Sequence, residues 1–189
     1  MEALFTSIAV VALAEIGDKT QLLAILLATR FRKPMPIVAG IFAATIANHL
    51  IAAFIGQQVS AALSSDWFRY AVAASFIAMA IWTLIPDKID DLEDKPARFG
   101  AFLTTLVSFF LVEMGDKTQI ATVALAARFD NVLTVAAGTT IGMMLANVPA
   151  VFLGHEIIAR VPLKLVRLIA AGLFLVIGIL LLAETAGWL

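Results

Sequence analysis

The chain contains no cysteine and little charge for its length of 189 residues. The lack of cysteine excludes disulfide bonds, thiolate metal sites and a cysteine nucleophile. Charged residues make up 14% of the chain and the formal net charge is −1, so there is no basic surface of the kind that binds nucleic acid. There is also no His-Glu-x-x-His motif and no Ser/His or Ser/Lys pair at a suitable spacing, so we do not expect an enzyme.

What the chain has in abundance is apolar sequence. Its hydrophobic fraction is 62% and its mean hydropathy is +1.00, far above the values of soluble domains. Because about 20 apolar residues cross a bilayer as a helix, the sequence predicts an all-α integral membrane protein. The N-terminus lacks the positive region of a signal peptide and carries Glu2, so we interpret it as a retained first span. Six segments meet the length requirement: roughly 3–29, 35–57, 67–85, 100–127, 133–154 and 165–187.

The distribution of Lys and Arg indicates an orientation. If the N-terminus is outside, the inside segments carry nine of these residues and the outside segments carry two. Cytoplasmic loops of membrane proteins are enriched in Lys and Arg. We therefore predict that both termini lie outside and that the acidic segment 86–99 is a cytoplasmic loop.

A polar motif occurs twice within the apolar sequence. "AEIGDKTQ" stands at 14–21 and "VEMGDKTQ" at 112–119, an offset of 98 residues. A gap-free comparison of 14–85 with 112–183 finds about 20 identical positions in 72. Each copy holds three spans, an odd number, so the second copy would enter the membrane upside down. The sequence thus predicts six transmembrane helices as two inverted three-helix repeats, 1–85 and 100–189, joined by the loop 86–99.

The acidic residues of the two motifs are expected near the middle of the bilayer. Asp18 lies 12 residues before Arg30, and Asp116 lies 12 residues before Arg128. At 1.5 Å per residue this is about 18 Å from the end of each span. On continuous helices, Glu15 with Asp18 and Glu113 with Asp116 would share a face at i and i+3. We therefore predict that these four carboxylates converge on one site.

The residues of this site suit a divalent cation. Four carboxylates with two lysines leave a formal charge of −2, and a charged residue within a membrane needs a partner. Carboxylate, amide and hydroxyl oxygens favour Mn²⁺, Ca²⁺ or Mg²⁺ over Zn²⁺ or Cu⁺. The expected ligands are Glu15, Asp18, Glu113 and Asp116, with Gln21, Gln119, Thr20 and Thr118 as further ligands. No resident cofactor is expected, because the metal would be the substrate.

The supporting residues have two interpretations each. Lys19 and Lys117 are either counter-ions or participants in transport. Asn48, His49 and Asn147 lie inside the second and fifth spans, where they either form interhelical hydrogen bonds or line the pathway. When the site is empty, crowded carboxylates would take up protons. A site that holds either a divalent ion or protons is the core of a cation/proton exchanger.

The duplicated E-x-G-D-K-T motif resembles the signature of the GDT family of cation exchangers. That family includes bacterial manganese exporters of the MneA type and Golgi manganese/calcium transporters. The resemblance covers the whole chain and implies export of Mn²⁺, or Ca²⁺ in some members, against protons, with the motif acids as ligands. It also implies a multi-pass protein of the bacterial inner membrane; the termini, predicted to lie outside from the Lys and Arg distribution, would then be periplasmic.

Two other functions fit the residues less well. A divalent cation channel could use the acids as a selectivity filter, and an exporter could carry a small organic cation or an amino acid. Paired lysines and an inverted repeat favour a carrier over a channel, and the absence of an aromatic residue from the motif favours a bare metal. The residues leave open the ion preference, the exchange stoichiometry, which acids carry protons, the role of the acidic loop and any homo-oligomeric state.

Overall fold

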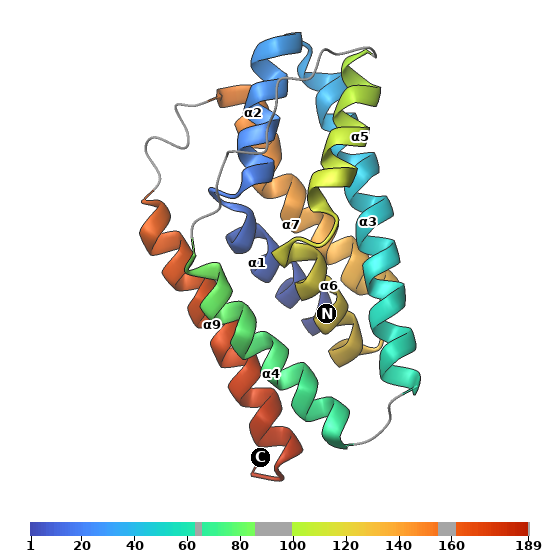
Figure 1. Cartoon of the computed structure of the whole chain (residues 1–189), viewed down its shortest axis with the longest axis vertical. Helices are drawn as coiled ribbons and strands as arrows, with labels where there is room; N and C mark the ends of the chain where they lie inside the picture. Colours follow the sequence, from blue (N-terminus) through green and yellow to red (C-terminus); the bar gives the residue numbers. More distant parts are fainter. Residues whose placement is uncertain (63–65, 86–99, 155–161, 189) are drawn as a thin grey trace.

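The computed structural model describes residues 1–62, 66–85, 100–154 and 162–188, and all regular structure in these ranges is helical (Figure 1). This agrees with the predicted all-α class. The acidic segment 86–99 lies outside the described residues. The helices are α1 (Glu2–Glu15), α2 (Lys19–Phe31), α3 (Pro34–Ala62), α4 (Asp66–Thr83), α5 (Ala101–Glu113), α6 (Lys117–Phe129), α7 (Val132–Leu153) and α9 (Leu163–Thr185).

Three of these helices, α3, α7 and α9, are long and apolar enough to cross a membrane. Large apolar side chains also cover the outside of the bundle; examples are Phe54, Leu145, Leu168 and Ile179, each about half exposed. Such a surface would be an aggregation hazard in water, whereas lipid solvates it. The structure therefore describes a membrane protein.

The first and fourth predicted spans are not continuous helices, and in this respect the sequence-based expectation was wrong. α1 ends at Glu15 and α2 begins at Lys19, while α5 ends at Glu113 and α6 begins at Lys117. Each half-helix has 13 or 14 residues, or about 20 Å, which is shorter than the hydrocarbon core. The i, i+3 face predicted for each Glu–Asp pair therefore does not exist, because the two acids lie on opposite sides of a break.

Close helix contacts hold the half-helices against α3 and α7 at the centre of the bundle. α1 packs along α7, and α5 packs along α3. Glycine allows this approach: a Cβ added to Gly138 would lie 2.7 Å from the Cβ of Ser7, and one added to Gly142 would lie 2.7 Å from the carbonyl oxygen of Ile8. Small residues let membrane helices approach closely and gain van der Waals contact.

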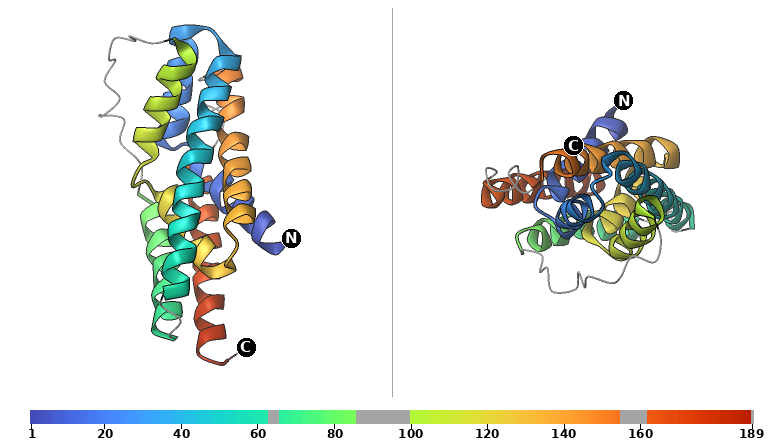
Figure 2. Two further views of the ribbon diagram at one scale, coloured as in Figure 1. Left: turned by 90° about the vertical axis from the view of Figure 1, so that its right-hand side faces the viewer. Right: turned by 90° about the horizontal axis from the view of Figure 1, so that it is seen from above.

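The remaining two helices, α4 and α9, form a pair that lies along one side of the bundle (Figures 1 and 2). The ring of Phe76 on α4 meets the ring of Phe174 on α9, with centroids 6.4 Å apart. α4 contacts α6, and α9 contacts α1. The pair therefore packs on one half-helix from each broken span, while α2 and α5 extend toward the other end of the molecule.

Candidate metal-binding site

The two motifs build the same backbone break. Gly17 and Gly115 have φ values of +80° and +78°, a conformation that side chains with a Cβ disfavour. The side-chain oxygen of Gln21 accepts a hydrogen bond from the Gly17 N–H at 2.9 Å, and that of Gln119 accepts one from the Gly115 N–H at 2.6 Å. In each motif, the hydrogen bond between Gly and Gln thus stabilises the break in the helix. The side-chain oxygens of Gln21 and Gln119 are therefore already bonded to backbone N–H groups.

Three carboxylates meet between the two breaks. Glu15, Glu113 and Asp116 each offer one oxygen, and these oxygens lie within 4.8 Å of one another. The three side chains are 0%, 1% and 4% exposed. Carboxylates buried together are costly unless cations or hydrogen bonds compensate them. We call these three residues the acid cluster.

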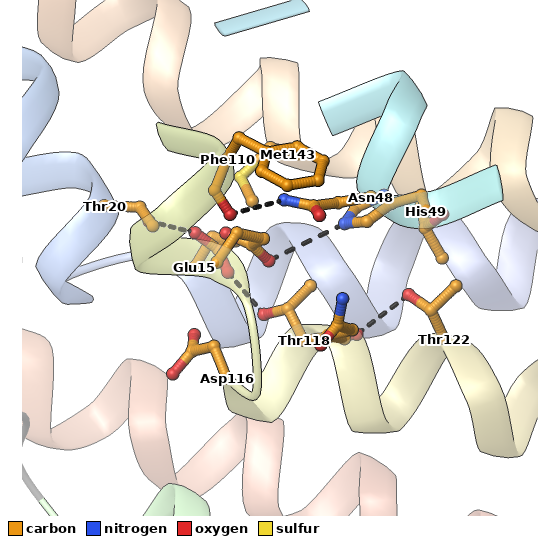
Figure 3. Close-up of polar contacts among 12 residues, drawn as sticks. Glu15, Thr20, Asn48, His49, Phe110, Asp116, Thr118, Thr122 and Met143 are labelled. Atoms are coloured by element: carbon orange, nitrogen blue, oxygen red, sulfur yellow. Dashed lines mark hydrogen bonds and ion pairs between the residues drawn. The ribbon is translucent and has the colours of Figure 1, made fainter. Parts of the chain in front are cut away.

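Glu15 is oriented by hydroxyl groups from both motifs. Thr20 on α2 donates a hydrogen bond to Oε2, and Thr118 on α6 donates one to Oε1 (Figure 3). Because a hydroxyl donating to a carboxylate keeps lone pairs of its own, the predicted role of these threonines as metal ligands stays a prediction. In the structure, the two hydroxyls donate to both oxygens of the Glu15 carboxylate and so restrict its orientation.

The other two acids keep oxygens open. Asp116 Oδ1 forms an ion pair with the Lys19 ammonium at 2.9 Å, and its Oδ2 has no hydrogen-bond partner among the described residues. Neither oxygen of Glu113 accepts a hydrogen bond from the described residues. An imidazole nitrogen, His49 Nε2, lies 3.7 Å from Glu113 Oε1. Three buried carboxylate oxygens are therefore available to a ligand.

Asp18 is not part of the acid cluster, although the sequence predicted that all four acids converge. It is buried and lines a small pocket with Lys117 and Arg167, whose volume of about 10 Å³ suits about one water molecule. Sequence reasoning did not single out Arg167, because it counted this residue only among the inside cations at the start of the sixth span. Arg69 and Arg167 are identical at the offset of 98 residues, and this match was the sequence feature that could have identified Arg167.

The supporting residues have separate environments. Lys117 donates to the carbonyl oxygen of Ile85 at 3.3 Å, and its ammonium lies 5.9 Å from the centre of the Trp82 ring. Gln21 also donates to the carbonyl oxygen of Ala146 on α7 at 2.8 Å.

Asn48 forms the interhelical hydrogen bond that one interpretation predicted, whereas the hydrogen bond of Asn147 stays within its own helix. Asn48 on α3 donates to the Phe110 carbonyl oxygen of α5 at 3.1 Å, which joins two helices. Asn147 donates to the carbonyl oxygen of Met143, one turn earlier in its own helix, at 3.1 Å.

The electrostatics of the acid cluster suit a divalent cation. Three carboxylates and the ammonium of Lys19 give −3 + 1 = −2 in formal charge. Glu15 and Glu113 are also the last residues of α1 and α5, and Asp116 directly precedes α6, so the cluster lies where the ends of half-helices meet. The all-oxygen donor set of the cluster matches the hard cations.

An all-helical membrane protein with buried acids at the ends of broken helices has the layout of a secondary ion transporter. The comparisons define the class more narrowly. The family model described as "Divalent cation/proton antiporter GDT1" matches residues 3–91 and 101–188. The chain belongs to this family, and it is therefore a divalent cation/proton antiporter rather than an enzyme.

The chain is also similar to curated relatives along nearly its whole length. A Vibrio cholerae protein named "Putative manganese exporter" is 51% identical over 180 residues, which cover 95% of this chain and 90% of the relative. A GDT1-like protein of Synechocystis is 28% identical and covers 92% and 93%. GDT1-like protein 5 of Arabidopsis thaliana is 27% identical and covers 92% of each. No solved structure matches the chain.

Proposed function

We propose that this protein exports Mn²⁺ across the bacterial inner membrane in exchange for protons, and that the acid cluster is the site that both ions share. The observation that carries the proposal is the meeting of Glu15, Glu113 and Asp116 within 4.8 Å at a formal charge of −2 with Lys19. The name of the Vibrio cholerae relative supports Mn²⁺ as the cargo. Ca²⁺ would fit the carboxylates of the cluster as a second cargo.

The proposed transport site lies between two inverted three-helix repeats, 1–85 and 100–189. In support, α2 begins at residue 19 and α6 at 117, α3 begins at 34 and α7 at 132, and each offset is 98 residues. The family model also matches one stretch in each half. The two broken spans would then cross the bilayer in opposite directions and meet at its middle, with both termini in the periplasm.

We further propose that the α4–α9 pair provides alternating access. α4 contacts α6 and α9 contacts α1, but the symmetry-related pairs, α4 with α5 and α9 with α2, make no substantial contact in the described parts of the chain. The pair therefore closes one end of the bundle and not the other. If α4 left α6 for α5, and α9 left α1 for α2, the site would open to the opposite side of the membrane.

Proteoliposomes loaded with a Mn²⁺-sensitive dye test the proposal. The wild-type protein should give saturable Mn²⁺ flux that stops when the pH gradient is collapsed, and Glu113→Gln should give less than a tenth of that flux. Glu2→Gln, at an exposed position, is the charge-matched control and should transport normally. Flux that neither saturates nor depends on the pH gradient would contradict exchange and indicate a channel.

A further inference from the structure

His49 is a buried imidazole without a hydrogen bond. Its side chain is 0% exposed, and neither ring nitrogen has a hydrogen-bond partner in the described part of the protein. Because a buried polar group without a partner costs free energy, such groups are rare and commonly mark a missing ion or water. The environment of His49 therefore indicates that its nitrogen binds something when the protein works.

The imidazole points at the acid cluster. Nε2 lies 3.7 Å from Oε1 of Glu113, which is itself without a hydrogen bond among the described residues. This separation is too long for a hydrogen bond. When two ligand atoms each lie about 2.1 Å from one ion, the distance between them depends on the ligand–ion–ligand angle. It is about 3 Å at 90° and about 4.2 Å at 180°. The observed separation falls within that range.

The residue of the second half that corresponds to His49 is an asparagine, and its nitrogen is hydrogen-bonded. Asn147 corresponds to His49 at the offset of 98 residues; its amide nitrogen donates to the carbonyl oxygen and the sulfur of Met143 in its own helix, while its amide oxygen has no hydrogen-bond partner among the described residues. Asn48, beside His49, is likewise bonded, to Phe110. Among the three polar residues of α3 and α7 that the sequence singled out, His49 alone directs an unengaged nitrogen at the acids.

We propose that His49 is a nitrogen ligand of the transported ion and that it sets a preference for Mn²⁺ over Ca²⁺ and Mg²⁺. This inference rests on the proposed function. Ca²⁺ and Mg²⁺ bind oxygen ligands almost exclusively, whereas first-row transition ions also accept imidazole. A site of three carboxylates would bind all of these ions by charge. One nitrogen among the oxygens favours Mn²⁺ without changing the charge.

This role predicts a change in selectivity rather than a loss of the site. Replacing His49 by Asn removes the nitrogen ligand and leaves Glu15, Glu113 and Asp116 in place. Ca²⁺ affinity should change by less than threefold, while Mn²⁺ affinity should fall about tenfold. A histidine that only fills space would lower both affinities together or neither.

Electron spin-echo spectroscopy of Mn²⁺ bound to the detergent-purified protein tests the nitrogen directly. The chain has two histidines, so His155→Gln is the matched control. We expect ¹⁴N modulation of the Mn²⁺ signal in the wild type and in His155→Gln, and none in His49→Asn. Labelling the wild type with ¹⁵N-histidine should shift the modulation. Competition of Ca²⁺ against Mn²⁺ in the same samples gives the affinity ratio.

The outcomes separate this inference from the proposed function. Bound Mn²⁺ without nitrogen modulation in the wild type, or an unchanged Mn²⁺/Ca²⁺ affinity ratio in a folded His49→Asn variant, would overturn the role of His49 alone. A wild-type protein that binds neither ion would overturn the proposed function itself. If His49→Asn does not fold, the wild-type spectrum and its ¹⁵N shift still decide the question.

Discussion

At the scale of single residues, the three clustered acids have different partners and hence different freedom. Glu15 is held by two threonine hydroxyls, Asp116 is held by Lys19 through one oxygen, and Glu113 has no hydrogen bond in the described residues. A group without fixed partners can reorient toward an arriving ion at little cost. Glu113 is therefore expected to make the largest adjustment when a cation binds.

The pair Asp116 and Asp18 offers a matched test, since each directly precedes a half-helix that begins with Lys-Thr-Gln. Asp116→Asn should weaken Mn²⁺ binding to the detergent-purified protein at least tenfold, because it removes a charge from the acid cluster. Asp18→Asn should weaken it less than threefold, because Asp18 lies outside the cluster. Titration calorimetry measures both affinities, and equal losses would contradict the three-acid site.

The sequence could predict that the two motifs meet, but not that their aspartates occupy different environments. Glu15 and Glu113 stand at equivalent places in a duplicated pattern, so an inverted pair of spans brings them together. The same logic treats Asp18 and Asp116 as equal. Only the packing of the whole chain places Asp116 beside Glu113 and Asp18 beside Lys117 and Arg167.

At the scale of helices, the breaks in the first and fourth spans are the main departure from expectation. Hydropathy identified these segments as apolar and long enough, but it contains no information on backbone dihedrals. Gly17 and Gly115 followed by Asp were the local signal, because glycine adopts a positive φ and Asp commonly precedes a helix. Within apolar sequence, that signal was interpreted as a site on a continuous helix.

Alanine substitutions at the breaks should destabilise the protein by different amounts. Gly115→Ala should cost about 1–2 kcal/mol from its positive φ alone, because a Cβ there meets nothing within 4 Å. Gly17→Ala should cost slightly more, because its Cβ would also lie 2.6 Å from the end of the Leu163 side chain, which would have to move aside. Thermal unfolding in detergent, measured for each variant, gives the order.

Gly172→Ala is the control for these variants. Gly172 lies within α9, has no positive φ and has open space around its Cβ position. Alanine there should be neutral or slightly stabilising, since alanine favours helices. A Gly115→Ala variant as stable as Gly172→Ala would show that the break does not require a positive φ.

At the scale of the whole molecule, orientation and access decide the direction of transport. The absence of cysteine allows single cysteines to be introduced without a background. In intact cells, a membrane-impermeant thiol reagent should label Glu2→Cys and Trp188→Cys, whereas Lys95→Cys should react only after the cells are opened. Labelling of Lys95→Cys in intact cells would contradict the orientation inferred from the Lys and Arg distribution.

The exchange of protons for metal at one site is the central claim, and counting protons tests it most directly. Because the acid cluster is buried and crowded, it should hold protons when empty and release them when Mn²⁺ binds. Calorimetric titration of the purified protein with Mn²⁺, in buffers of different ionisation enthalpy, counts the protons released. We expect about one or two per ion, and an affinity that weakens as the pH falls from 8 to 6. No proton release, with an affinity that stays constant over that range, would contradict the account.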